Sequence, residues 1–443
     1  MKHIPENGMD RDQLLAEMAI CKQREGDVDW RHGRGWSLVY YAGEEHTRLL
    51  SDVYKLYFSE NGLSPTAFPS LRKFEAEVVS MILKLLGAVG DECGTMTSGG
   101  TESILLAMKS YRDQSRADKT TVNNPEILVP ESAHPAFLKA AQYFDLRAVP
   151  IPLDDNFHAS LTAVEERITD QTVCIVASAP CYPHGVIDPI TELGELAMRY
   201  DIGLHVDACL GGFLLPFLRK LGKQVRDFDF SVPGVTSISA DLHKNGYAAK
   251  GASAIFYRTP ELRRHQYFIS SDWPGGLYGS PTMLGTRPGG AIAAAWAAMM
   301  SLGEAGYTDL ARRALQVTDD LLEGIRTING LKIFGEPDMT VMTFGSDEVN
   351  IFAVADRLDA KGWRIDRQRN PDCIHLIATP NHAQSVTPFL TDLKSAVDEE
   401  LCNPTILDKE KKSMLYGVTA TVSDDSDLDA FMRRSIDDGY RVL

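Results

Sequence analysis

A short glycine-rich segment opens a predicted helix and has the composition of an anion-binding loop. Residues 97–103 read TSGGTES and run directly into a strong helix former at residues 104–109. Backbone N–H groups and the positive end of the helix dipole meet at such a junction, and Ser98 or Thr101 adds a hydroxyl donor, so a phosphate can be held there without a lysine. A merely capped helix start would use the same residues, and the segment is neither a Walker loop nor a dinucleotide-binding motif.

An aspartate and a lysine each follow a predicted buried strand further along the chain. Asp207 comes directly after the strand at residues 203–206, and Lys244, with His243 beside it, follows the strand at residues 237–239. A buried carboxylate needs a cationic partner, and a protonated ring nitrogen is one that fits. We expect the neighbours of the lysine to lower its pKa, so that it can form a Schiff base with a carbonyl group. Taken singly, the two residues equally suit a turn cap and a solvated loop.

Pyridoxal phosphate has three groups that a protein can bind: a phosphate, a ring nitrogen and an aldehyde. In chain order, the loop, the aspartate and the lysine match these groups. The loop suits the phosphate, Asp207 the ring nitrogen and Lys244 the aldehyde. Because the three features coincide, the sequence predicts a pyridoxal-phosphate site rather than three unrelated structural residues.

Predicted strands and helices alternate through the middle of the chain and would bring these residues together. Strand-like segments lie at residues 126–129, 173–177, 203–206, 237–239 and 254–257, with helical segments between them. This order predicts an α/β fold with a mostly parallel sheet, in which ligands bind at the carboxyl ends of the strands. We expect residues 66–310 to form this large domain, residues 1–65 an N-terminal arm of the kind that embraces a partner subunit, and residues 311–443 a smaller α+β domain.

Composition and charge narrow the class of protein. The 443 residues are 44% hydrophobic and carry a net charge of -16, which favours a globular protein that repels nucleic acid and anionic lipid surfaces. We expect no signal sequence and no transmembrane anchor, since the longest apolar run, at residues 291–302, is too short to span a bilayer. The seven cysteines are scattered without a Cys-x-x-Cys pair, so we expect neither disulfides nor a metal site, and a cytoplasmic location.

Several motifs in this sequence resemble those of the sphingosine-1-phosphate lyases, within the wider group of fold-type-I pyridoxal-phosphate decarboxylases. They are SGGTES at residues 98–103, HVDACLGGF at 205–213, HK at 243–244 with KG at 250–251, and GSPT and GTRPG within 279–289. The similarity extends over roughly residues 33 to 385. Cys209 favours the lyases, because the amino-acid decarboxylases usually have an alanine there.

The resemblance implies a fold-type-I transferase architecture, a homodimer with shared active sites, and a role for each matching residue. It implies that Lys244 forms the Schiff base, that Asp207 pairs with the pyridine nitrogen, that His134 stacks on the ring, that Gly100, Thr101 and His243 hold the phosphate, that Ser280 reaches this phosphate from the other subunit, and that Lys250 assists catalysis. From the sequence alone, His134 is only a loop histidine.

The implied reaction is a retro-aldol cleavage of a phosphorylated long-chain amino alcohol into an aldehyde and phosphoethanolamine. Proton transfer would fall to Lys250, His243 or Tyr40, which the sequence does not rank. Decarboxylation of an L-amino acid is the alternative reaction, since it needs the same cofactor residues. A cofactor-binding protein without activity is a third hypothesis, disfavoured because a binding module needs no nucleophile matched to an electron sink.

Departures from the lyase pattern gather among residues expected near the substrate. Trp36 and Ser37 stand where the lyases have Ser-Gly, Ser64 stands where they have a histidine, and Asn245 replaces a usual tyrosine. The missing histidine is among the residues that the resemblance places on the substrate's phosphate. We therefore expect an intact cofactor end and an altered substrate entrance.

Overall fold

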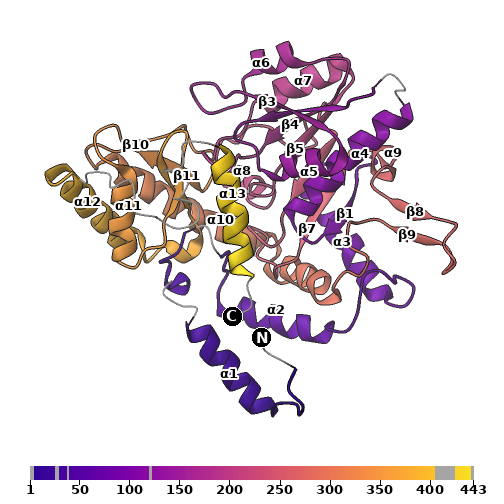
Figure 1. The fold of residues 1–443 in the computed structure, drawn as a ribbon, viewed down its shortest axis with the longest axis horizontal. Coiled ribbons are helices and arrows are strands. Elements are labelled where there is room, and N and C mark those ends of the chain that lie inside the picture. The colour runs from indigo at the N-terminus through magenta and orange to yellow at the C-terminus, as the bar shows by residue number, and fades with distance from the viewer. Residues whose placement is uncertain (1–3, 25–28, 37–38, 119–121, 405–424, 441–443) are drawn as a thin grey trace.

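The computed structural model describes residues 4–24, 29–36, 39–118, 122–404 and 425–440. A seven-stranded sheet lies in the middle of the molecule and a four-stranded sheet lies to one side of it (Figure 1). In the large sheet β3, β2, β4, β5 and β6 run parallel, and only β7 is antiparallel to its neighbours β6 and β1. The predicted α/β class with a mostly parallel sheet is therefore confirmed.

The large sheet has the strand order β1-β7-β6-β5-β4-β2-β3. Its strands are β1 (Cys93–Thr97), β2 (Glu126–Pro130), β3 (Arg147–Ile151), β4 (Thr172–Ser178), β5 (Gly203–Asp207), β6 (Ser237–Ala240) and β7 (Ser253–Tyr257). Every residue of β2, β4, β6 and β7 is buried, as a sheet with both faces covered requires.

Helices cover this sheet and connect its parallel strands. They are α3 (Pro69–Leu85), α4 (Gly100–Asp118), α5 (Ala136–Phe144), α6 (Leu161–Arg167), α7 (Ile190–Tyr200), α8 (Leu215–Lys220) and α9 (Pro260–Arg264). The N-terminal segment contributes α1 (Arg11–Arg24), the short helix η1 (Trp30–His32) and α2 (Glu44–Leu56). No helix within the described ranges combines the length and the apolar character that crossing a membrane requires.

The smaller sheet is antiparallel, in the order β10-β11-β13-β12. Its strands are β10 (Lys332–Ile333), β11 (Val341–Gly345), β12 (Asp366–Gln368) and β13 (Cys373–Ile377), accompanied by α11 (Ile351–Ala360), η2 (Pro380–His382), α12 (Val386–Cys402) and, near the C-terminus, α13 (Asp425–Gly439). A separate hairpin, β8 (Phe268–Ser270) with β9 (Tyr278–Ser280), extends away from the body (Figure 1).

Helix α10 (Gly289–Arg326) joins the two sheets. Its side chains as far as Ala311 pack into the core of the large sheet, and those from Val317 onward pack into the core of the small sheet. This change of core supports a domain boundary near residue 310, and we keep the division at residues 65 and 310 as a proposal.

The strand directions gather the predicted site residues at one edge of the large sheet. β1, β2, β5 and β6 all run the same way, and the anion-binding loop, His134, Asp207 and Lys244 each follow or end one of them. The edge is the one that holds the carboxyl ends of the parallel strands, where ligands bind in folds of this type.

Candidate active site

The predicted anion-binding loop connects β1 to α4, and its glycine is required by close packing. A Cβ on Gly100 would lie 2.8 Å from the Cys209 sulfur and 3.0 Å from both carboxylate oxygens of Asp241. The loop is also braced from within the helix, because the Glu102 carboxylate accepts the Ser98 N–H at 2.6 Å. The first turn of the 19-residue helix α4 thus faces the site with its positive dipole end.

Asp207, at the end of β5, is buried and remains charged. Its Oδ1 accepts hydrogen bonds from the Cys209 N–H at 3.0 Å and from the Ser239 hydroxyl at 3.1 Å. Burial alone raises the pKa of Asp207, but the hydrogen bonds from Cys209 and the positive charge of Lys244 outweigh it and leave the pKa below its usual value. A buried carboxylate of this kind is suited to a protonated ring nitrogen.

Lys244 follows β6 and forms an ion pair with an acid that the sequence analysis did not assign. Its Nζ lies 3.0 Å from Asp241 Oδ2. Burial lowers the pKa of Lys244, yet the nearby negative charges, Asp241 first, raise it further than burial lowers it, so its net pKa is above the usual value. The expectation that neighbours lower the pKa of Lys244 is therefore wrong for this structure.

The lysine with a lowered pKa is Lys250. Burial and the charge of Lys244 both disfavour its protonated form. Its Nζ donates to the His243 carbonyl at 3.2 Å and lies 5.6 Å from the centre of the Tyr40 ring. Burial, with a smaller contribution from Asp241, raises the pKa of Tyr40 to about 12, against the opposing effect of Lys244. Tyr40 is thus a proton donor at neutral pH, and Lys250 is the better base.

Two histidines have their tautomers fixed by backbone groups. His243 Nδ1 accepts the Ala252 N–H at 3.2 Å, and His134 Nδ1 accepts the Ala136 N–H at 3.1 Å. Each neutral ring must therefore carry its proton on Nε2. Burial lowers the pKa of His243, with Lys244 and Lys250 acting in the same direction against Asp241. His243 is accordingly a neutral donor through Nε2.

The anion-binding loop, Asp207 and Lys244 line one cavity of about 410 Å³, together with both histidines, whereas Lys250 and Tyr40 are not among its lining residues. Its wall comprises Ser98, Gly99, Gly100, Thr101, Glu102, Ile104, His134, Asp207, Cys209, Asp241, His243 and Lys244. A larger, open depression of about 640 Å³ beside α3 and β1 contains none of the predicted residues. We assign the site to the smaller cavity, because ionisable groups converge there.

The cavity fits pyridoxal phosphate. The α4 N-terminus and the His243 Nε2–H offer donors to a phosphate, the charged Asp207 suits a pyridinium nitrogen, and Lys244 supplies the amine. The glycine at position 100 keeps the loop within reach of the cavity, since a side chain there would collide with Asp241. The phosphate, the ring nitrogen and the aldehyde of the cofactor therefore each have a matching group in the cavity.

Asp241 is the cavity residue that the sequence analysis missed. It is 2% exposed, and its Oδ1 is buried with no hydrogen-bond partner among the described residues. Its position was the available signal. Asp241 directly follows β6, much as Asp207 ends β5, and it precedes Lys244 by three residues.

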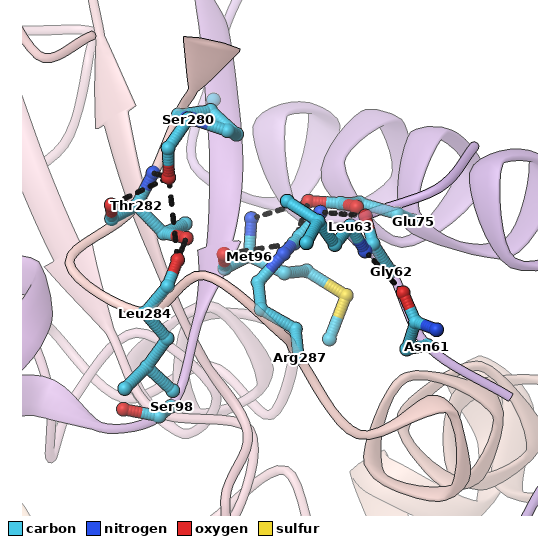
Figure 2. Close-up of polar contacts among 12 residues, drawn as sticks. Asn61, Gly62, Leu63, Glu75, Met96, Ser98, Ser280, Thr282, Leu284 and Arg287 are labelled. Carbon is cyan, nitrogen blue, oxygen red and sulfur yellow. Dashed lines mark hydrogen bonds and ion pairs between the residues drawn. The ribbon is translucent and has the colours of Figure 1, made fainter. Parts of the chain in front are cut away.

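Ser280 lies outside the cavity wall of its own chain. At the end of β9, its hydroxyl bonds the Thr282 carbonyl at 2.9 Å and the Leu284 carbonyl at 3.2 Å (Figure 2). The resemblance places Ser280 in the site of the other subunit, and its role there stays a prediction.

Trp36 does not lie at the substrate entrance. It is fully buried in the core of the small sheet, stacked on His382 at 4.3 Å between ring centres and near Trp363 at 6.3 Å. The expectation that Trp36 alters the entrance is wrong, because its ring fills a core position. Ser37, its neighbour in that prediction, lies outside the described residues.

The other two departures also have structural partners. The buried Asn245 side chain donates to the Leu210 carbonyl at 2.9 Å, bracing the turn that follows Asp207. The Ser64 carbonyl accepts the amides of Ala67 and Phe68 just before α3. Neither residue lines the cavity.

Comparisons with known proteins identify the class of enzyme. Residues 28–346 match the pyridoxal-dependent decarboxylase conserved domain. The fold and the cavity thus define a pyridoxal-phosphate-dependent enzyme.

Individual relatives narrow the class further. A sphingosine-1-phosphate lyase of Oryza sativa subsp. japonica is 45% identical over 429 residues, covering 95% of this chain and 78% of the relative. The solved structure of a Burkholderia pseudomallei sphingosine-1-phosphate lyase has a TM-score of 0.91 and 36% identity, covering 100% of this chain and 98% of that one. This chain belongs to the sphingosine-1-phosphate lyase family.

The amino-acid decarboxylases are more distant. A glutamate decarboxylase of Lactobacillus brevis has a TM-score of 0.78 at 20% identity, covering 92% of this chain and 96% of that one, which shows a shared fold alone. The fold-type-I architecture inferred from the sequence is confirmed, and the decarboxylase alternative is the weaker of the two.

Proposed function

We propose that this enzyme cleaves a phosphorylated long-chain amino alcohol, with sphingosine 1-phosphate as reference substrate, into a long-chain aldehyde and phosphoethanolamine. The observation that carries the proposal is the convergence of Lys244, Asp207 and the anion-binding loop in one cavity, in a chain of the lyase family. Bound pyridoxal phosphate would supply the electron sink for breaking the carbon–carbon bond.

Five residues would hold and orient the cofactor. Gly100 and Thr101 at the start of α4, with the His243 Nε2–H, bind the phosphate, while Asp207 holds the ring nitrogen and His134 stacks on the ring. These contacts fix the ring plane, and so decide which substrate bond stands perpendicular to it.

Lys244 would attach the cofactor covalently and must lose a proton to do so. Its ammonium lies 3.0 Å from Asp241 Oδ2, and this ion pair favours the protonated form, so the proton leaves to solvent when the aldehyde is attacked. Neutral Lys244 is then the nucleophile toward the aldehyde. The ion pair seen here would therefore be the resting arrangement of the lysine.

Lys250 would take the proton from the substrate hydroxyl as the carbon–carbon bond breaks. Its lowered pKa makes the neutral amine more accessible than in an ordinary lysine, whereas Tyr40 retains its proton and can donate a hydrogen bond. His243, protonated on Nε2 and facing Asp241 Oδ2 at 3.7 Å, suits phosphate binding better than proton abstraction.

We propose that a second copy of the chain completes the site, so that the enzyme is a homodimer. We propose the cytoplasm as its location. The hairpin of β8 and β9 presents apolar side chains to solvent, with Phe268 57%, Ile269 68% and Leu277 81% exposed. A partner subunit that covers this hairpin would bury them. The same contact would bring Ser280 toward the partner's cofactor phosphate.

Product analysis tests the proposed reaction. The cofactor-loaded protein is incubated with sphingosine 1-phosphate and analysed by mass spectrometry, with Lys244→Ala as the blank. We expect a long-chain aldehyde and phosphoethanolamine that are absent from the blank. Carbon dioxide release from an L-amino acid without aldehyde formation would instead establish the decarboxylase alternative.

A further inference from the structure

Arg287, from the GTRPG motif, is buried behind the cofactor cavity and makes three polar contacts (Figure 2). It is 8% exposed. Its Nη1 pairs with Glu75 Oε1 at 2.7 Å and donates to the Met96 carbonyl at 3.4 Å, and its Nη2 donates to the Gly62 carbonyl at 3.1 Å. The Arg287 side chain thus contacts three segments that all lie far from it in the sequence.

The first pair of contacts closes the open edge of β1. β1 is the edge strand of the large sheet, so the polar groups of Met96 that point away from β7 have no neighbouring strand. Glu75 Oε1 accepts the Met96 N–H at 3.2 Å while Arg287 binds the Met96 carbonyl. Because Met96 precedes Ser98 by two residues, this ion pair holds the strand end from which the phosphate loop departs.

The second set of contacts holds residues 60–64. The Gly62 N–H donates to the Arg287 carbonyl at 2.8 Å, and the Gly289 N–H donates to the Glu60 carbonyl at 2.8 Å. The packing is close, because a Cβ on Gly62 would lie 2.9 Å from the Ile292 side chain and 3.2 Å from Arg287 Nη2. This loop carries Ser64, where the lyases have a histidine.

Arg287 is also adjacent to the catalytic segments. It lines a small cavity together with Ser98 of the phosphate loop and Gly251, which follows Lys250. A shift of the guanidinium would therefore be transmitted to the phosphate loop on one side and to residues 60–64 on the other.

We propose that Arg287 and Glu75 form a clamp that fixes the phosphate loop and residues 60–64 relative to each other. Both are positioning residues and act through the backbone that they hold. The part of this inference that concerns substrate rests on the proposed function. The part that concerns cofactor affinity stands without it.

Two substitutions separate the contacts of Arg287 that hold the phosphate loop from its contact with residues 60–64. Arg287→Gln leaves the half-buried Glu75 without its cation and loosens Met96, so we expect pyridoxal phosphate to bind about tenfold more weakly or worse. Arg287→Lys keeps the charge opposite Glu75 but lacks the second arm that reaches Gly62. We expect it to retain cofactor affinity within about threefold while its KM for sphingosine 1-phosphate rises about tenfold with little change in kcat.

The measurements are spectroscopic titration of the cofactor-free protein with pyridoxal phosphate, followed by steady-state kinetics of the loaded enzyme. Arg357→Gln is the matched control, since it removes the buried 2.6 Å ion pair with Glu400 in the small domain. A purely structural role would lower thermal stability in both Gln variants and leave the ligand constants unchanged, which would overturn the proposal. Equal weakening of cofactor binding in the control would also overturn it.

The proposed reaction and the clamp are tested by different measurements, so one can be wrong while the other is right. If wild type binds pyridoxal phosphate but leaves sphingosine 1-phosphate intact, the reaction is wrong, while the titrations of Arg287→Gln and Arg357→Gln still decide the cofactor half of the clamp. Should Arg287→Gln not fold, Glu75→Gln replaces it, because it removes the same charge pair and keeps an acceptor for the Met96 N–H. Unchanged cofactor affinity in folded Glu75→Gln would contradict the clamp.

Discussion

The cofactor end of this enzyme and the loop of residues 60–64, which we propose as its substrate end, are held in place by different means. At the cofactor end, Asp207 ends β5 and Lys244 follows β6 of the buried sheet, and a Cβ on Gly100 would lie within 3.0 Å of the side chains of Cys209 and Asp241. At the proposed substrate end, residues 60–64 form a loop bound through its backbone to Arg287 and Gly289. Little variation is possible in the first region, whereas in the second a side chain such as that of Ser64 can change without disturbing the backbone bonds that hold the loop.

The tight packing of the cofactor end is tested by Gly100→Ala. The added methyl would meet Asp241 and Cys209 at 3.0 Å and 2.8 Å, displacing the loop that binds the phosphate. We expect pyridoxal phosphate to bind at least about 100-fold more weakly, which spectroscopic titration measures.

Gly99→Ala is the matched control for this change. Its Cβ would make an ordinary contact of 3.6 Å with His243. We expect cofactor affinity within about threefold of wild type. If both variants bind the cofactor equally well, close packing does not define this end of the site.

The proposed role of Lys250 as the base is tested through pH dependence. As a base it must be neutral, so kcat/KM should rise with pH through a pKa below the usual lysine value, because burial and the charge of Lys244 disfavour its protonated form. We expect Lys250→Met to lower kcat by about 100-fold and to remove this rising limb of the profile, while cofactor binding is retained. A rising limb that persists in Lys250→Met would assign the base elsewhere.

The tolerance of the substrate end predicts a small effect for Ser64→His. Its backbone carbonyl, and not its side chain, makes the bonds that lead into α3. We expect the restored histidine to lower KM for sphingosine 1-phosphate about threefold, with unchanged kcat and cofactor affinity. An effect on cofactor affinity as large as that of Gly100→Ala would remove the distinction between the two ends.

Sequence patterns predicted the features that depend on neighbouring residues. Alternating strands and helices indicated the parallel sheet, and residues directly after strands indicated the site. The ion pair of Glu75 with Arg287 could not be found in this way, because the two residues lie 212 positions apart. The place of Trp36 was missed for the same reason, since its neighbours Trp363 and His382 come from the far end of the chain.

The prediction for the pKa of Lys244 was wrong because one contact decides the direction in which this pKa is shifted. The position of Lys244 after a strand, with His243 beside it, suggested a lowered pKa, and burial does act in that direction. Asp241, one turn earlier in the chain, reverses the result through an ion pair at 3.0 Å. A sequence places the two residues near each other but does not give the direction of their side chains.

The most direct test of the site is to trap the cofactor on its lysine. Borohydride reduction of the cofactor-loaded protein, followed by peptide mapping with mass spectrometry, identifies the residue that carries the pyridoxyl phosphate group. Our account predicts the label on Lys244, with Lys250 unmodified. A label on Lys250 or on any other lysine, or no label on a protein that binds the cofactor, would contradict it.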